Sequence, residues 1–384
     1  MPRAAKMTDV TVVGAGPAGA MTAFYLAALG LKVHIIEKRK FPRHKPCGGG
    51  LTRRALQEIP FDLSEVIEDV GHTIQLSIGE RLLMKRRFSP PPVVLVRRER
   101  FDAFLLEKAL GAGARFQDNT VFRGLNGSFG NLVIQTSRGT FRSRVIVGAD
   151  GTQSRVRKAL GCRGPLAAMV ALAATVRPSG PGAMAAFRSR IDFDFQRKWM
   201  GYGWVFPKKT ELSVGVMSHG SRPGPMRSRF YEYLHHKGFQ DADVVGLRAH
   251  RIPCTPGLRF HLSKERGILV GDAAGLCDPI TGEGIYAAVC QARLAAETIG
   301  DCFSNRSALS AYEARVQSRF GADNACARWM GAFLYHLPGL SHRILDLHRH
   351  YLLRRYLAVA AGTTTYRAEF MPPVVLRRLA GLTR

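Results

Sequence analysis

The chain has 384 residues, 46% of them hydrophobic, a globular composition that excludes wholesale disorder. Lysine and arginine number 56 and aspartate and glutamate 29, which gives a formal net charge of +27. Such a charge attracts phosphate on nucleic acid, anionic lipid or a charged substrate. The basic residues are dispersed and are not interleaved with stacking aromatic side chains, so the sequence argues against nucleic-acid binding.

The seven cysteines are scattered and include no Cys-x-x-Cys pair, which argues against a disulfide framework and a zinc site. A reducing, cytoplasmic compartment fits this usage best. The apolar run at residues 10–13 stops at a glycine turn, and no window approaches the roughly 18 apolar residues of a membrane span. We therefore expect a cytoplasmic protein without a bound metal, which could still bind at a membrane surface.

The first elements form a strand–helix–strand unit. The pattern predicts a buried strand over residues 9–13, a helix over 17–29 that Gly30 ends, and a second buried strand over 32–36. A unit of about thirty residues has the size of a parallel crossover.

The next part of the chain mixes strands and helices. Residues 73–87 are expected to form antiparallel strands and residues 101–110 a helix. Residues 113–144 resemble a meander, and 144–148 another short buried strand. The meander's turns are expected at Asn126-Gly127, Phe129-Gly-Asn131 and Arg138-Gly139.

The second half of the chain begins with a sheet-like region. Residues 167–262 have the pattern of strands, with one helix near 226–236. A buried strand at 267–271 and a helix of small residues at 285–299 then restore the first pattern, and the chain beyond residue 308 is helical and basic.

The expected fold is α/β (α+β). Residues 1–72, 93–166 and 263–307 would form a discontinuous Rossmann-type domain, with an inserted, mostly antiparallel substrate-binding sheet from 73–92 and 167–262. Residues 308–384 would form a C-terminal helical region.

The glycine fingerprint Gly14-x-Gly16-x-x-Gly19 lies between the first strand and the first helix. Glycines there permit a tight turn, the approach of a pyrophosphate to the backbone and close helix packing. Glu37 ends the second strand, where it could accept hydrogen bonds from both ribose hydroxyls of an adenosine. A glycine turn that merely packs is the alternative. The other candidate cofactor contacts here are Pro17, Ala18 and Lys38.

Two later segments narrow the choice of cofactor. Val-Gly-Ala-Asp-Gly at 147–151 and Gly-Asp-Ala-Ala-Gly at 271–275, in this order after the fingerprint, resemble the flavoprotein hydroxylase superfamily typified by para-hydroxybenzoate hydroxylase. The resemblance implies FAD, with its ribityl chain held by Asp272 beside Gly271 and its pyrophosphate near Asp150 and Gly151. It also implies that Arg98 reaches over the ribityl-phosphate region. Taken alone, Asp150 could sit in a simple turn and Asp272 could cap a helix.

The run Asp-Pro-Ile-Thr-Gly-Glu-Gly at 278–284 precedes the helix that starts near Ile285. Its N-terminal amides would point at the N1–C2 carbonyl edge of the flavin and stabilise the anionic reduced form. A glycine-rich loop covering any cofactor is the alternative. The candidate cofactor contacts in this run are Pro279, Gly282, Gly284 and Ile285.

Three runs together look like the geranylgeranyl reductase family: Lys-Pro-Cys-Gly-Gly-Gly at 45–50, Gly-Trp-Val-Phe-Pro-Lys at 203–208, and the run at 278–284. The resemblance extends to about residue 299, and residues 360–366 resemble the family's C-terminal ending more loosely. It implies FAD-dependent reduction of isolated double bonds in a prenyl chain, by an enzyme peripheral to the membrane.

Period-two alternation places Met200, Tyr202, Trp204 and Phe206 on one face of a strand. This apolar wall suits a prenyl chain, although ordinary core packing would give the same pattern. Lys208, at the end of the run, could meet a substrate diphosphate or only solvent.

Reduction of an isolated alkene needs a hydride from the flavin and a proton on the neighbouring carbon. Cys47, flanked by Gly48 and Gly49, could lie near the isoalloxazine as a cofactor contact or a proton donor, or could simply pack. Cys47 and Tyr202 are the catalytic candidates. A flavin-dependent aromatic or lipid monooxygenase and a non-catalytic flavin- or lipid-binding protein are the alternatives.

Two further expectations concern partners. No second glycine fingerprint follows a strand, so NAD(P)H or a small redox protein would supply electrons transiently. Near the C-terminus, one helix face with a basic flank could attach to an anionic membrane or pack against the protein. The residues that trace this face are Ile344, Leu347, Tyr351, Leu352 and Arg355.

Overall fold

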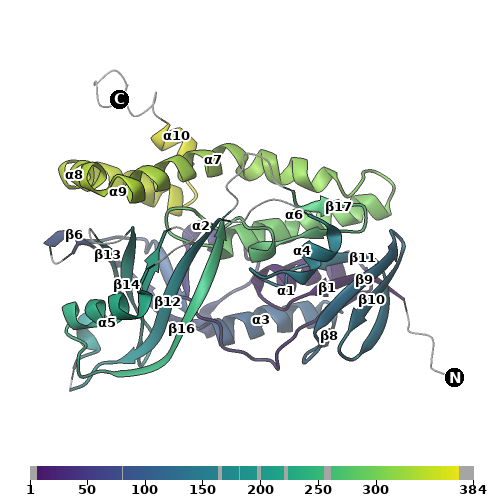
Figure 1. Cartoon of the computed structure of the whole chain (residues 1–384), viewed down its shortest axis with the longest axis horizontal. Coiled ribbons are helices and arrows are strands. Elements are labelled where there is room, and N and C mark those ends of the chain that lie inside the picture. The colour runs from purple at the N-terminus through teal and green to yellow at the C-terminus, as the bar shows by residue number, and fades with distance from the viewer. Residues whose placement is uncertain are drawn as a thin grey trace.

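The fold is a mixed α/β architecture, seen in a computed structural model (Figure 1) that describes residues 7–79, 81–162, 167–180, 182–196, 200–219, 224–254 and 261–371. Its largest sheet has eight strands in the order β17-β18-β11-β1-β2-β8, with β10 and β9 added antiparallel beside β11. The strands are β1 (Thr8–Val13), β2 (Val33–Ile36), β8 (Arg115–Gln117), β9 (Phe122–Ser128), β10 (Asn131–Thr136), β11 (Gly139–Gly148), β17 (Ser263–Lys264) and β18 (Gly267–Leu269).

The centre of this sheet is parallel, as the crossover pattern predicts. Val10, Val12 and Val147 are fully buried in its core, and helix α1 (Pro17–Ala28) packs between the sheet and helix α6 (Ile285–Phe303). Strands from the start, the middle and the second half of the chain lie side by side here. The Rossmann-type fold with its sequence-distant pieces is therefore confirmed.

Three sequence predictions in this sheet are wrong. Asn126-Gly127 lies inside β9, because the hairpin turn is made at Phe129-Gly130, where Gly130 has φ +85°. β8 pairs in parallel with β2 and does not join the meander. The strand expected at 144–148 is the end of β11, which runs unbroken from Gly139.

The second large sheet has seven strands in the order β16-β12-β15-β14-β13-β5-β6, and all neighbours are antiparallel except β13 and β5. Its strands are β5 (Thr73–Ile78), β6 (Arg81–Arg87), β12 (Ala167–Arg177), β13 (Arg190–Gln196), β14 (Gly201–Pro207), β15 (Leu212–Ser218) and β16 (Asp243–Cys254). A small third sheet consists of β3 (Gly50–Thr52), β7 (Val93–Val96) and β4 (Ile67–Gly71), in that order.

The seven-stranded sheet has two different faces. Leu172, Val205 and Val214 point to the face covered by helix α5 (Met226–His236), which contributes Phe230 and Tyr233. Alternate residues of the same strands point the other way and form a second, aromatic cluster. This second face is the one that borders the cavity described below.

The remaining helices are α2 (Arg53–Gln57), α3 (Arg98–Gly111), α4 (Arg155–Leu160), α7 (Ala311–His336), α8 (Pro338–Leu347), α9 (Arg349–Ala360) and α10 (Tyr366–Phe370). Short 3₁₀ turns are η1 (Ser64–Val66), η2 (Ala185–Phe187) and η3 (Gly271–Ala273). Figure 1 shows α7 to α10 together along one side of the molecule, next to α6 and the seven-stranded sheet and opposite α5.

The single basic helix face expected between residues 344 and 355 is not continuous. α8 ends at Leu347 and α9 begins at Arg349, with His348 between them. In α9, Leu353 and Leu357, which are not on the predicted face, pack against Ile74. Leu347, which is on that face, is exposed. Within the ranges given above, no helix is long and apolar enough to cross a membrane, and residues 372–384 lie outside those ranges.

Candidate active site

A cavity of about 1130 Å³ is lined by both large sheets, the loop before β3 and helix α9. Its volume is at the upper end of that of small-molecule sites, so it can hold a large cofactor with part of a substrate. Most of the predicted site residues line it, whereas Gly19, Pro279 and Lys208 do not. The predicted residues that do are Gly14, Gly16, Pro17, Ala18, Glu37, Lys38, Cys47, Gly48, Gly49, Arg98, Asp150, Gly151, Tyr202, Trp204, Phe206, Gly271, Asp272, Gly282, Gly284 and Ile285.

The glycine fingerprint brings backbone to the cavity. Gly14 has φ +106°, and a Cβ there would collide with the carbonyl oxygen of Ala149 on the neighbouring strand end. A Cβ at Gly19 would collide with the carbonyl of Gly14, so Gly19 lets α1 pack against the turn. The buried Glu37 carboxylate accepts hydrogen bonds from the backbone N–H groups of Ala15 (3.0 Å) and Arg39 (3.1 Å), which fix it beside this turn.

Asp150 stabilises the next segment of the wall. Its carboxylate accepts hydrogen bonds from the Ser154 hydroxyl (2.5 Å) and from the backbone N–H groups of Arg155 (2.7 Å) and Val156 (3.2 Å) at the start of α4. Burial raises the pKa of Asp150, and these hydrogen bonds oppose the shift. The side chain therefore shapes the turn, and Asp150 and Gly151 line the cavity there.

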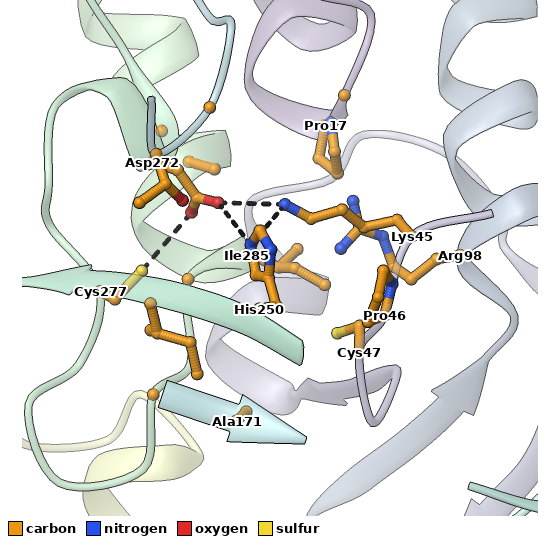
Figure 2. Close-up of a pocket in the computed structure, with 18 of the residues that line it drawn as sticks. Pro17, Lys45, Pro46, Cys47, Arg98, Ala171, His250, Asp272, Cys277 and Ile285 are labelled. Atoms are coloured by element: carbon orange, nitrogen blue, oxygen red, sulfur yellow. Dashed lines mark hydrogen bonds and ion pairs between the residues drawn. The ribbon is translucent and has the colours of Figure 1, made fainter. Parts of the chain in front are cut away.

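Asp272 lies at the centre of a polar cluster from three parts of the chain. Figure 2 shows Lys45, His250 and Asp272 turned toward one another. The Lys45 ammonium is 3.2 Å from Asp272 Oδ2 and 2.9 Å from His250 Nε2, and the Cys277 thiol donates to Asp272 Oδ1 at 3.6 Å. Burial raises the pKa of Asp272, but Lys45 and His250 outweigh it and hold that pKa well below its usual range. His250, on β16, was missed because no sequence pattern links it to residues 45 or 272.

Arg98 is fixed by a buried ion pair. Its guanidinium makes two parallel hydrogen bonds to the Asp102 carboxylate, at 2.8 and 2.9 Å, and Arg43 contacts the same carboxylate at 3.1 Å. Burial alone would lower the pKa of Arg98, but Asp102 and Cys47 raise it, and the Cys47 side chain is a hydrogen-bond partner. The arrangement holds a permanent positive charge beside the Cys47 thiol, at the wall of the cavity.

The aromatic wall forms as expected, with one exception. Tyr202, Trp204 and Phe206 of β14 line the cavity and are buried. A Cβ at Gly48 would lie 2.8 Å from the Phe206 ring, so glycine allows the loop to pack onto this wall. Met200 precedes β14 and is 36% exposed, so its place in the wall is a wrong prediction: the regular alternation begins only where the strand begins.

The polar groups of this wall are already engaged. The Tyr202 hydroxyl donates to the Thr281 carbonyl at 2.5 Å, and burial raises the pKa of Tyr202. Lys208 meets neither solvent nor the cavity, contrary to expectation. It is 4% exposed and donates to the Gly48 carbonyl at 2.8 Å, behind the loop. Burial lowers the pKa of Lys208 to about 8, although Cys47 and Glu68 oppose the shift.

Asp278 anchors the loop that carries Gly282 and Gly284. Its Oδ1 accepts from the backbone N–H groups of Ile280 (2.9 Å) and Thr281 (3.0 Å), and its Oδ2 accepts from Arg54 (3.1 Å) and the Tyr366 hydroxyl (2.7 Å). The side chain is therefore saturated by partners on the side away from the cavity.

The C-terminal helices reach the same loop. Arg54 of α2 also binds the Glu283 carboxylate at 2.8 Å, and the Tyr335 hydroxyl of α7 donates to the Ile280 carbonyl at 2.6 Å. The predicted cofactor contact Pro279 is buried on this outer side, where its carbonyl faces Gly331 of α7. The contribution of α7 and α10 was missed because their partners lie far away in the sequence.

The lining fits FAD along its length. Glu37 stands where an adenosine would bind, the glycine turn presents backbone N–H groups to phosphates, and Asp272 offers an ionised carboxylate to ribityl hydroxyls. The segments 47–49 and 282–285 line the cavity together with the aromatic wall and would border the isoalloxazine. This donor set suits a nucleotide with a long polyhydroxyl linker.

Comparison with known proteins supports FAD as the cofactor. Residues 7–177 match the FAD binding domain family. The chain is 30% identical to the digeranylgeranylglycerophospholipid reductase of Methanocella arvoryzae, over 82% of this chain and 83% of the relative. It is also 30% identical to the geranylgeranyl diphosphate reductase of Rhodobacter capsulatus, over 75% of this chain and 74% of the relative.

Two solved structures share the fold. A geranylgeranyl bacteriochlorophyll reductase-like protein from Thermoplasma acidophilum superimposes with a TM-score of 0.77 at 23% identity, over 98% of this chain and 99% of that one. Aklavinone-11 hydroxylase, solved with FAD and aklavinone, superimposes with a TM-score of 0.64 at 19% identity, over 87% and 70%. The two reductases described above, each 30% identical to this chain, show that the chain belongs to the geranylgeranyl reductase family of FAD-dependent oxidoreductases.

Proposed function

We propose that this protein reduces carbon–carbon double bonds in a prenyl chain. The observation that carries the proposal is the pairing, in one cavity, of an aromatic wall with the two glycine-rich segments that fit a flavin. Tyr202, Trp204 and Phe206 offer buried, mainly apolar surface, and the Tyr202 hydroxyl is already engaged. Such a wall suits a hydrocarbon chain, with the Trp204 indole N–H as its one unpaired donor among these three side chains. The reductases among the relatives support the same chemistry.

When bound, FAD supplies the hydride for such a reduction, and the protein must supply the proton and exclude water. Cys47 is the stronger proton-donor candidate. Its thiol lies at the cavity wall beside Arg98, whereas the Tyr202 hydrogen is already donated to a backbone carbonyl. We therefore assign Tyr202 to shaping the wall and to holding Thr281, and Cys47 to proton delivery.

An anaerobic turnover experiment tests the proposal. Chemically reduced FAD-bound protein is incubated with geranylgeranyl diphosphate or geranylgeraniol, and the lipid is analysed by mass spectrometry. We expect a gain of about two mass units per reduced double bond. In Cys47→Ser the rate of reduction should fall by at least about 100-fold, the scale of general acid catalysis. Cys302→Ser, in helix α6 and outside the cavity lining, is the matched control.

The same experiment separates the alternatives. A product heavier by one oxygen atom, formed only in air, would identify a monooxygenase. Unchanged lipid in both conditions, with flavin that is not reoxidised, would leave only a binding protein. NAD(P)H and a reduced small redox protein are then compared as electron donors by the rate of flavin bleaching.

A further inference from the structure

The cavity face of the seven-stranded sheet changes character from one edge to the other. Across the order β16-β12-β15-β14, the cavity-facing residues pass from basic and polar on β16, through alanines on β12 and Met217 on β15, to the aromatic side chains of β14. Isoleucine and phenylalanine continue the apolar surface on β13 and β5. A ligand along this face would therefore meet charge at one end and hydrocarbon at the other.

The strand register fixes which residues of β16 face the cavity. His250 lies opposite Ala171 of β12, and Arg248 lies opposite Ala173. Directly opposed residues of an antiparallel pair point to the same side of the sheet. Ala171 and Ala173 belong to the aromatic cluster on the cavity face, so Arg248 and His250 point to that face as well.

Arg248 and Arg251 are two basic residues of β16 that line the cavity, and among the described residues neither has a carboxylate partner. Of the two, Arg248 lies opposite an alanine of the cavity face. It is exposed at the cavity lining. The charge of Lys45, in contrast, is balanced by Asp272. Because Asp272 balances Lys45, the charges of Arg248 and Arg251 remain at the β16 edge of the cavity.

Hydrogen-bonding groups accompany these charges. The Lys45 ammonium can only donate, so His250 Nε2 is the acceptor in their contact, and Nδ1 is the other ring nitrogen available to a ligand. Lys45 has three N–H donors, of which Asp272 and His250 take two. The edge therefore offers a guanidinium, an ammonium hydrogen and an imidazole nitrogen, a set of groups that suits a phosphate group.

We propose that Arg248, His250 and Lys45 form a binding site for the phosphate group of an amphiphilic substrate. The inference rests on the proposed reduction of a prenyl chain and names the head group of its substrate. From β16 to β14 there are three strand spacings of roughly 4.8 Å, so the head group and the aromatic wall lie about 14 Å apart. The alanines of β12 leave room for the chain between them.

A phosphate could also come from FAD itself, and the experiment must separate the two sources. Binding of geranylgeranyl diphosphate and of geranylgeraniol to the oxidised, FAD-bound protein is measured by calorimetry and by the change in flavin absorbance. The variants are Arg248→Gln and, as a control, Arg123→Gln. Arg123 is exposed on β9 and outside the cavity lining, so the control makes the same charge change elsewhere.

We expect the wild-type protein to bind the diphosphate at least tenfold more tightly than the alcohol. Arg248→Gln should weaken diphosphate binding by about 10-fold to 100-fold, the scale of charged hydrogen bonds. Its affinities for the alcohol and for FAD should stay within about twofold of the wild-type values. Added salt should weaken diphosphate binding less in Arg248→Gln than in the wild type. Arg123→Gln should behave as the wild type.

Four results would overturn the head-group site. Equal binding of diphosphate and alcohol by the wild type, or an equal loss of both in Arg248→Gln, would show that no phosphate is recognised, while the mass gain of the anaerobic assay would leave prenyl reduction standing. Weaker FAD binding with an unchanged ligand preference would assign Arg248 to the cofactor. Wild-type protein that neither binds nor reduces either ligand would overturn both proposals.

Discussion

Two aspartates six residues apart show how this protein uses charge on the two sides of its cavity wall. Asp272 faces the cavity, with a side chain 25% exposed and Lys45 and His250 as partners. Asp278 lies behind the wall, with a side chain 5% exposed and Arg54 and Tyr366 as partners. Both are carboxylates beside a cation, yet only one remains available to a ligand.

The difference lies in how many lone pairs are already used. Each oxygen of Asp278 accepts two hydrogen bonds, so nothing is left for a ligand. From the part of the chain that the structure describes, Asp272 Oδ1 accepts only a weak side-chain hydrogen bond, from a thiol at 3.6 Å. The two lysines differ in the same way: Lys45 lines the cavity, and Lys208 lies in the layer behind it. Ligand binding and fold stability should therefore respond to different members of each pair.

The largest effect is expected from Arg54, which holds the layer behind the wall. Arg54→Met would leave the buried carboxylates of Asp278 and Glu283 without their cation, which costs about 3–5 kcal/mol in the free energy of unfolding. Urea unfolding of the FAD-free protein measures it. Arg53→Met, one residue earlier, is the control, because Arg53 forms no ion pair with any described residue. A change below about 1 kcal/mol in Arg54→Met would contradict this account.

Lys208 gives a pH-dependent test of the same layer. Its folded pKa of about 8 is lower than the roughly 10.4 of an unfolded lysine, so the folded chain binds fewer protons between these pH values. The free energy of unfolding should therefore rise from pH 8 to pH 10.4. Below pH 8 the buried lysine is charged in the folded state, and its destabilising effect on the fold is fully present. Relative to Lys208→Met, the wild type should gain on the order of 2–3 kcal/mol over this range.

The measurement is urea unfolding of both proteins at several pH values. Lys209→Met is the control, since the neighbouring Lys209 is exposed and should give a pH profile parallel to that of the wild type. The contact with the Gly48 carbonyl indicates that the Lys208 ammonium is buried. Parallel pH profiles of the wild type and Lys208→Met would contradict that burial.

The sequence predicts local elements and cofactor motifs well, because both depend on neighbouring residues. The helix expected at 226–236 forms between those residues, and the glycine turn lies between β1 and α1. The partners of the motif residues could not be predicted in this way. Asp272 meets Lys45 from 227 positions away, and Tyr366 meets Asp278 from 88 positions away. Only the tertiary fold decides such pairs.

Lys208 and Pro279 lie outside the cavity lining for the same reason. Lys208 ends an alternating strand and has the pattern of an exposed cation, but the loop at 45–50 folds over it and takes its hydrogen bond. Pro279 belongs to a motif that resembles a cofactor loop, but α7 packs on the side where it lies. In both cases an element distant in sequence determines which side of the cavity wall the residue occupies.

The smallest of these effects, and the most direct test of the contrast, compares Asp272→Asn with Asp278→Asn. Asp272→Asn removes an ionised acceptor from the cavity, so FAD affinity should fall about 10-fold to 100-fold, or roughly 1.5–3 kcal/mol, with little change in the unfolding of FAD-free protein. Asp278→Asn should lower the free energy of unfolding and leave FAD affinity closer to the wild type. FAD titration and urea unfolding of both variants measure this. Equal losses of FAD affinity would mean that the loop behind the wall and the carboxylate in the cavity act as one unit.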